Sequence, residues 1–292
     1  MCFVVIAPHQ HAVHLGVAKP YPHATIPSKQ LPLNPPLSFA TAFILACAKH
    51  LSLTKSQLAS HHLVIATPST TMTPRTKASL RHAARLLNMQ IRFYPAYRCF
   101  TAVAARPCTI LDIALTHTAI FNQHRLHVVK TALHQVQHQF KSNLQSLPQQ
   151  QLDHLTANAA VVPPSTHSEL GEVTADSYTV SGEVRKNAGD AFFTEDVETN
   201  LACCVARFLQ SSHDVYERDR NRYIFCVGSG ALPGISRRLQ KEFERCRDQF
   251  GLNGITLHVV QTQFEAGVVA WVGACVLAVA GQQGDDDEDR IG

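Results

Sequence analysis

The segment Tyr223–Gly234, with the sequence YIFCVGSGALPG, holds the residues best suited to bind a ligand. Its apolar first half, 223–227, predicts a strand, and the closing Pro-Gly pair opens a helix predicted over 236–250. Between them lies a predicted glycine turn, whose residues are Gly228, Ser229 and Gly230. A turn of this kind leaves backbone N–H groups open to a phosphate or a nucleoside. A purely structural turn between a strand and a helix needs the same residue types, so the pattern alone leaves both interpretations open.

Histidine and cysteine are abundant, with 17 His and 9 Cys. His9, His11 and His14 are close together, and His134 and His138 have i, i+4 spacing, but no H-E-x-x-H motif occurs and no carboxylate completes a ligand set. The cysteine count is odd and no C-x-x-C occurs, which indicates free thiols in a reducing compartment. We therefore expect no metal site, and a cytoplasmic or nuclear location.

Strands and helices alternate along the whole chain. Apolar runs predict strand hairpins over 2–7 with 11–17 and over 109–113 with 116–121. Further predicted elements are a basic helix over 73–88, a Gln- and His-rich helix over 126–147, strands over 177–184 and 255–260, and an apolar helix over 267–280. The alternation predicts an α/β architecture, and each half of the chain begins with the same strand, hairpin and helix pattern.

The composition excludes several classes of protein. Of the 292 residues, 45% are hydrophobic, which is enough for a large core, and no apolar stretch reaches membrane-spanning length. The net charge is only +4 and no run of Lys and Arg occurs, so we expect neither a membrane nor a nucleic acid as a direct partner. Only 16% of residues are charged, which favours a protein held against partner subunits.

Several runs of sequence are similar to the actin-related proteins. VGSGALPGISRRL (227–239) resembles their adenosine-side motif, ILDIALTHTAIF (110–121) their second phosphate hairpin, and AWVGACVLA (270–278) their returning apolar helix. The runs 63–96 and 177–193 also resemble actin segments, so the likeness covers nearly the whole chain. It implies an actin-like fold of two ribonuclease-H-like α/β lobes around a cleft, with reduced small subdomains.

The resemblance also implies a division of the chain. The first lobe would comprise 1–107 and 263–284, with a C-terminal helix that returns to it. The second lobe would comprise 108–262, and the acidic residues 285–292 would form a disordered tail.

The chain departs from the actin pattern where an actin binds phosphate and Mg²⁺. At the first hairpin Ala7 replaces the acidic residue, Pro8 removes an N–H, and His9 and His11 replace two glycines. At the second hairpin the glycines and one acidic residue are lost, and Asp112 remains. The resemblance therefore implies no catalytic residues, no metal, and weakly bound ATP or ADP at most.

The residues left for a degenerate nucleotide site are Gly228, Ser229, Gly230 and Asp112. Arg98 falls where the family usually has the Gln that positions the attacking water. In the family the lower cleft contacts partners, which here implies partner contacts at Trp271, Tyr97 and Phe100.

These departures imply a non-catalytic subunit of a cytoskeletal assembly. The shortest members of the family include the pointed-end subunits of dynactin, which acts in microtubule-based transport. The resemblance therefore implies other actin-related or dynactin-like subunits as partners, and a cytoplasmic, cytoskeletal location. Two alternatives remain open at this point: a nuclear actin-related subunit of a chromatin-remodelling complex, and an actin-like protein or sugar-kinase-like enzyme that still uses ATP.

Overall fold

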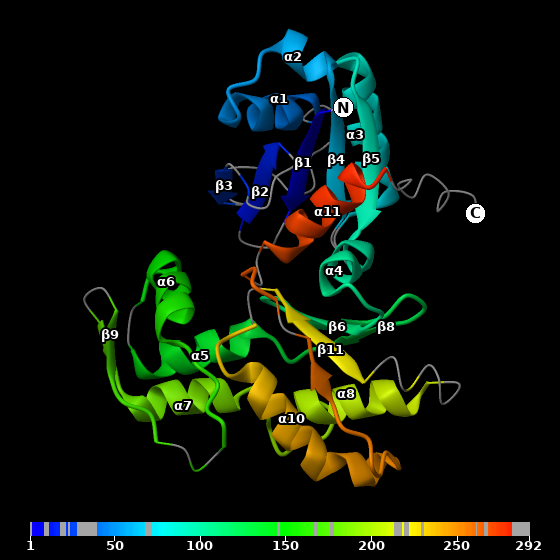
Figure 1. Cartoon of the computed structure of the whole chain (residues 1–292). Coiled ribbons are helices and arrows are strands. Elements are labelled where there is room, and N and C mark those ends of the chain that lie inside the picture. Colours follow the sequence, from blue (N-terminus) through cyan, green and yellow to red (C-terminus); the bar gives the residue numbers. More distant parts are fainter. Residues whose placement is uncertain are drawn as a thin grey trace. The chain divides into compact units, whose positions relative to one another are not determined.

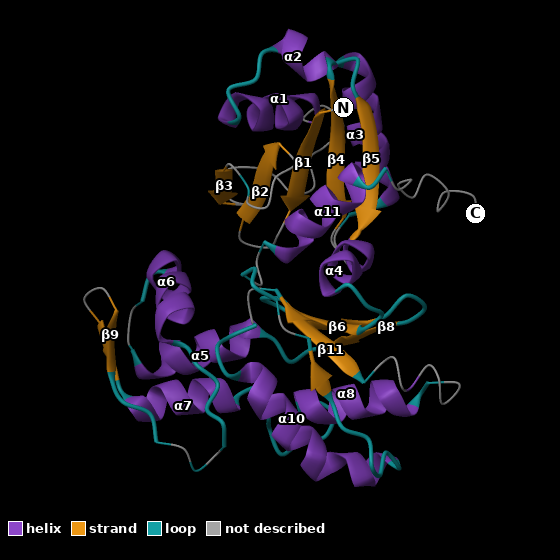
Figure 2. Ribbon diagram, in the orientation of Figure 1, coloured by secondary structure: helices purple, strands orange, loops and turns teal. Residues whose placement is uncertain are grey.

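The structure is a computed structural model, and its elements are shown in Figure 1 and Figure 2. It describes residues 2–8, 12–17, 22, 24–27, 40–67, 72–144, 147–165, 167, 169–175, 178–212, 218, 222–228, 231–260, 262–265 and 268–281. Over these described residues the fold is mixed α/β, with three sheets and helices between their strands. The chain divides into two compact units: unit 1 is Met1–Arg106 with Thr262–Gly292, and unit 2 is Pro107–Gln261.

Unit 1 is built on a five-stranded sheet with the order β3-β2-β1-β4-β5. Its strands are β1 (Cys2–Pro8), β2 (Ala12–Val17), β3 (Ala24–Pro27), β4 (His61–Thr67) and β5 (Gln90–Pro95). Its helices are α1 (Ala40–His50), α2 (Lys55–Ala59), α3 (Pro74–Leu86), α4 (Ala96–Ala104) and α11 (Val269–Val279). β1, β2 and β3 pair in antiparallel order, and β1, β4 and β5 pair in parallel.

Both faces of the unit 1 sheet are buried. Alternate residues of β1 and β4 point to opposite faces, so Ile6 packs with α1 and α3 while Val5 packs with α11. On the second face α11 contacts α4, β1 and β4. The returning apolar segment is therefore part of the core of unit 1, although it follows unit 2 in the sequence.

Unit 2 contains a second five-stranded sheet, with the order β12-β11-β6-β7-β8. Its strands are β6 (Thr109–Ile113), β7 (Thr118–Phe121), β8 (Leu126–Val129), β11 (Tyr223–Val227) and β12 (His258–Val259), and a separate hairpin comprises β9 (Val173–Ala175) and β10 (Tyr178–Val180). Its helices are α5 (Leu133–Asn143), α6 (Gln149–Ala159), α7 (Gly182–Asp190), α8 (Leu201–Gln210), α10 (Ile235–Cys246) and the 3-10 helix η3 (Arg247–Phe250). As in unit 1, three strands (β6, β7 and β8) pair in antiparallel order. The first of them, β6, pairs in parallel with β11, and β11 pairs in parallel with β12.

One continuous apolar core holds the sheet and helices of unit 2 together. It joins Leu111 of β6 and Ile224 of β11 to the inner faces of α8 and α10. Figure 1 shows α8 and α10 on the same side of β6 and β11. Because β6 and β11 pair in parallel, their carboxyl ends meet at one edge of the sheet, where the glycine turn begins.

Most predicted elements of the sequence are present, and three need correction. The helix predicted over 126–147 is wrong in its first part, because 126–129 form β8 and the helix begins at Leu133. The strand predicted over 177–184 is limited to 178–180, since Ser181 caps α7 with its side chain on the Val184 N–H. The strand predicted over 255–260 is reduced to the two residues of β12.

Within the described ranges, none of the helices has the length and apolar character that crossing a lipid bilayer requires. The acidic residues 285–292 lie outside the described residues.

Candidate functional site

The structure brings together two of the four residues expected at the nucleotide site. Val227 pairs with Asp112 across the parallel strands β11 and β6, so Gly228 follows directly beside the Asp112 carboxylate. Gly228 has a φ of +88°, and a Cβ at this position would lie 2.5 Å from Asp112 Oδ1 and 2.6 Å from the Ile113 carbonyl oxygen. Glycine is therefore required here by the end of β6, whether or not a ligand is bound. Ser229 and Gly230 lie outside the described residues.

Asp112 is an unusual carboxylic acid. Its side chain is half-buried at the end of β6, and burial raises its pKa from 3.8 to about 6. The raised pKa follows from burial, because removal from water penalises the charged form of a carboxyl group. Because the folded chain binds the proton more tightly than the unfolded chain, stability falls as the pH rises from about 4 to about 6.

Asp112→Asn is accordingly expected to stabilise the protein at pH 7.5, by about 2 kcal/mol, because the amide carries no charge to desolvate. The gain should shrink toward zero below pH 4, where the Asp112 carboxyl is protonated in both states. Urea denaturation of both proteins at a series of pH values measures the difference. Destabilisation at pH 7.5 would show instead that the ionised carboxylate makes a favourable contact.

The last glycine of the segment 223–234 is also explained by packing. Gly234, at the start of α10, has a φ of +88°, and a Cβ there would lie 2.1 Å from the Val162 carbonyl oxygen. The Val162 N–H donates to the Pro233 carbonyl oxygen at 2.8 Å. The segment 160–163 thus lies directly against the Pro-Gly pair, in the space that a side chain would need.

A buried arginine holds α10 in this position. Arg238 is 1% exposed, and its guanidinium contacts Glu242 Oε1 at 2.7 Å, Asp190 Oδ1 at 3.2 Å and the Pro163 carbonyl oxygen at 3.2 Å. It also lies over the ring of Phe193, 5.3 Å from the ring centroid. Arg238 therefore ties α10 to α7 and to the segment 160–163. Its signal in the sequence is a charged residue between Ile235 and Leu239 on the apolar side of a helix, with a Glu four residues later.

The hairpin turn between β6 and β7 has a structural role. The Ala114 N–H donates to the His117 carbonyl oxygen at 3.0 Å, which closes a short turn without glycine. The carbonyl oxygens of Ala114 and Leu115 accept from the first N–H groups of α5, those of Leu133 at 3.0 Å and of His134 at 2.8 Å. A helix N-terminus is an anion site when its N–H groups are open. At α5, two of those groups are engaged by the turn.

The first-hairpin positions and Arg98 belong to unit 1. Ala7 is 2% exposed in β1 and pairs with His14, while His9 and His11 lie outside the described residues. The Arg98 guanidinium is 6.0 Å from the centroid of the Tyr94 ring. Ala7 is thus a buried core position without a carboxylate, and Arg98 contacts the aromatic ring of Tyr94.

The expected partner contacts need a correction. Trp271 is fully buried in the core of unit 1, and its indole N–H donates to the Val5 carbonyl oxygen at 3.3 Å. It is therefore a core residue and not a partner contact. Phe100 is also buried, whereas Tyr97 is half-buried.

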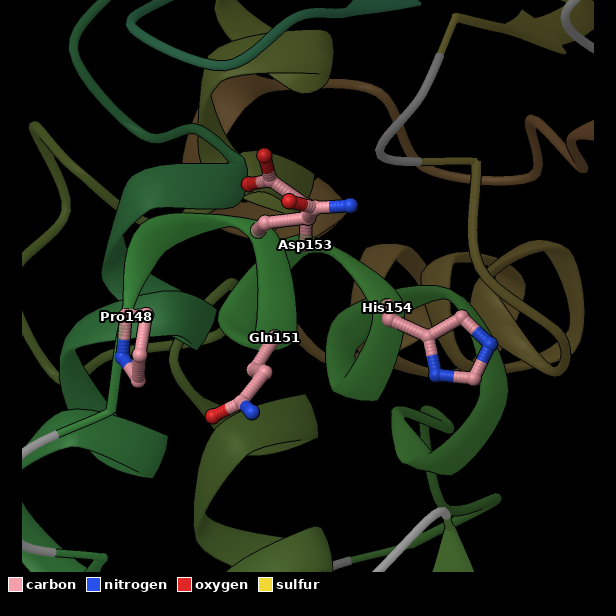
Figure 3. Close-up of a pocket in the computed structure, with 5 residues that line it drawn as sticks. Pro148, Gln151, Asp153 and His154 are labelled. Carbon is pink, nitrogen blue, oxygen red and sulfur yellow. The ribbon is translucent and has the colours of Figure 1, made fainter.

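Unit 2 also has a surface depression of about 600 Å³, at the first turns of α6 (Figure 3). It is lined by Pro148, Gln150, Gln151, Asp153 and His154. In Figure 3 the side chains of Gln151, Asp153 and His154 point away from one another. Asp153 Oδ1 accepts from the amides of Gln137 and Gln149, and Gln151 accepts from the Tyr178 hydroxyl. These groups stabilise the packing of α6 and do not converge on a ligand.

The thiols of unit 2 do not form a nucleophilic centre. Burial raises the pKa of Cys226 and of Cys246 to about 12, and that of Cys204 to about 11. A thiol with such a pKa is protonated at neutral pH and is a poor nucleophile and metal ligand. In the part of the chain that the structure describes, no three His, Cys, Asp or Glu side chains are grouped as metal ligands would be.

Comparison with known proteins assigns no family to the chain. No protein-family model matches it, and no curated protein matches its sequence.

Proposed function

We propose that this chain is a non-catalytic, actin-related subunit of a larger assembly. The observation that carries the proposal is the repeated sheet. The order β3-β2-β1-β4-β5 in unit 1 and the order β8-β7-β6-β11-β12 in unit 2 have the same sequence of antiparallel and parallel pairings. This repeat is what two ribonuclease-H-like lobes of an actin-like fold require. The bounds of the two units also fall close to those that the sequence resemblance implies.

The chemistry of the site supports a subunit without ATPase activity. Actin-type hydrolysis needs open N–H groups around the phosphates and carboxylates that hold Mg²⁺ through water. Here the turn after β6 lacks glycine and engages the N-terminus of α5, and Ala7 offers no carboxylate. The glycines 228 and 234 are accounted for by the backbone that lies against them.

Within this proposal, the most fitting assembly is a dynactin-like complex in which the chain is a pointed-end component. The support is the sequence resemblance. A subunit of this kind would use an actin-like surface once and block further addition.

Loss of nucleotide is tested directly on the purified protein. We expect the supernatant of heat-denatured native protein to contain less than about 0.1 equivalent of ATP or ADP per chain by ion-exchange chromatography, because the phosphates supply most of the anchoring in such sites. A conventional actin purified and denatured in parallel provides the positive control. One equivalent of nucleotide would refute the loss of the nucleotide site, which is one support of the non-catalytic assignment.

The assembly is tested by affinity purification of a tagged chain, expressed at its native level, followed by mass spectrometry. We expect actin-related and dynactin-like subunits in constant ratio to the tagged chain. Recovery of remodelling-complex subunits would favour the nuclear alternative instead. The same experiment on the destabilised Gly234→Ala chain shows which recovered proteins bind misfolded chain, because chaperones should then be enriched relative to the specific partners.

A further inference from the structure

Two histidines on helix α5 have the spacing of a metal-binding pair. His134 and His138 are four positions apart in the helix, so their Cβ atoms lie about 5–6 Å from each other on one face. The two histidines of an H-E-x-x-H zinc helix have the same spacing. Both side chains are exposed, so an ion in solution can reach them.

A backbone carbonyl group determines the tautomer of His134. Its Nδ1 lies 3.1 Å from the Leu115 carbonyl oxygen. Because a carbonyl oxygen can only accept, His134 Nδ1 has the hydrogen, and Nε2 has the lone pair in the neutral ring. The backbone N–H of His134 donates to the same oxygen at 2.8 Å, which anchors this residue at the start of α5.

Ser142 determines the tautomer of His138. The Ser142 hydroxyl donates to the His138 carbonyl oxygen at 2.9 Å, which uses its single hydrogen. The contact of 3.4 Å between Ser142 Oγ and His138 Nδ1 therefore has Nδ1 as its donor. Each ring of the pair thus has its hydrogen on Nδ1, and its lone pair on Nε2 is available to a ligand.

These hydrogen bonds are of the kind that metal-binding histidines make. A ligating imidazole typically donates its other N–H to a carbonyl oxygen or another polar group, which orients the ring and makes the free nitrogen a better ligand. Among the described residues, neither Nε2 of the pair has a hydrogen-bond partner. Imidazole nitrogens suit Zn²⁺, Cu²⁺ and Ni²⁺, whereas Ca²⁺ and Mg²⁺ prefer oxygen ligands.

Gln135 occupies the position at which an H-E-x-x-H helix has its catalytic Glu. Its Oε1 accepts from the Ala132 N–H at 3.2 Å, so the amide is directed to the start of α5. An amide also cannot take a proton from a metal-bound water, as a carboxylate does. Within the described ranges, no third His, Cys, Asp or Glu is grouped with the pair. The arrangement therefore favours metal binding without hydrolysis.

We propose that His134 and His138 form a binding site for one divalent transition-metal ion, Zn²⁺, which both Nε2 atoms ligate. Two protein ligands leave the remaining positions of a tetrahedral ion to water, so the ion exchanges readily with the solution. A bound ion would join two consecutive turns of α5 and would stabilise the folded chain by mass action. The inference is independent of the proposed function.

NMR spectroscopy of the full chain with ¹⁵N-labelled histidine tests the proposal. Before metal is added, the Nε2 atoms of His134 and His138 should give the signals of unprotonated ring nitrogens, and the variants His134→Gln and His138→Gln assign these signals. Titration with ZnCl₂ should then shift both Nε2 signals together, with saturation at one ion per chain. A protonated Nε2 in either neutral ring, or a response of one ring alone, would overturn the proposal.

Calorimetric titration with ZnCl₂ measures the affinity of the same site. His134→Gln and His138→Gln should each weaken it by at least about tenfold, because a single imidazole no longer chelates the ion. The matched control, His50→Gln with His82→Gln, removes two exposed helical histidines that have no histidine one turn away, and it should leave the affinity unchanged. Circular dichroism checks that all variants are folded. Equal weakening in the control, or binding of one ion by two chains, would contradict the proposed site.

Discussion

Replacing Arg238 with alanine is expected to lower the free energy of unfolding by about 3–5 kcal/mol, the largest effect that we anticipate for a single side chain here. The guanidinium lies between Asp190 and Glu242 and is 1% exposed, so its removal takes away the buried cation that pairs with Asp190 and leaves Glu242 with only the exposed Arg245. Burial already raises the pKa of Asp190, and Arg238 is the main group that opposes this. Denaturation in urea, followed by far-UV circular dichroism, measures the loss.

Arg245 provides the matched control for this prediction. It contacts the same Glu242 Oε1, at 2.8 Å, but its side chain is 56% exposed. Arg245→Ala should therefore change the free energy of unfolding by less than about 1 kcal/mol. A second variant, Arg238→Met with Asp190→Asn and Glu242→Gln, removes all three charges and should recover more than half of the loss. Equal effects of Arg238→Ala and Arg245→Ala would show that burial of the ion pair has no energetic role.

Gly234→Ala is expected to cost about 3 kcal/mol or more, because two separate requirements exclude a side chain at this position. The φ of +88° is unfavourable for alanine, and the new methyl group would lie 2.1 Å from the Val162 carbonyl oxygen. The backbone must move to relieve such a contact, and the move would break the hydrogen bond from the Val162 N–H to the Pro233 carbonyl oxygen. The expected result is a large loss of stability without any ligand in the solution.

Gly254 separates the two requirements. Its φ is +78°, but a Cβ there would have no neighbour within 4 Å. Gly254→Ala should cost only about 1 kcal/mol, from backbone strain. The difference between the two variants, about 2 kcal/mol, measures the crowding at the glycine motif. If both variants lose the same amount, then the motif glycine is not sterically required and its ligand-binding interpretation gains weight.

Together these results bear on what the glycine segment does. In a ligand site, the glycines would leave space that the ligand fills. In this chain, the space beside Gly228 is occupied by the end of β6, and the space beside Gly234 by the segment 160–163. Gly228 and Gly234 are therefore accounted for by their role in joining β11 and α10 inside unit 2.

The sequence by itself determined the local elements and the α/β class. Helix α3 was predictable because Thr73 and Pro74 are strong start signals and apolar residues recur on one side. The hairpin of β6 and β7 was predictable from two short apolar runs close together in the chain. The choice of Gly228 and Asp112 as neighbours rested on family resemblance, and periodicity alone would not have paired them.

Only the tertiary structure decided the rest, because the deciding contacts join residues far apart in the sequence. Residues 126–129 became a strand since β7 offers them an antiparallel partner, which overrides the helical period of 126–147. Trp271 became a core residue because α11 returns to the sheet of unit 1, where Val5 accepts its N–H. The ion-pair partner Asp190 of Arg238 was hidden from the sequence, since it comes from α7, 48 residues earlier in the chain.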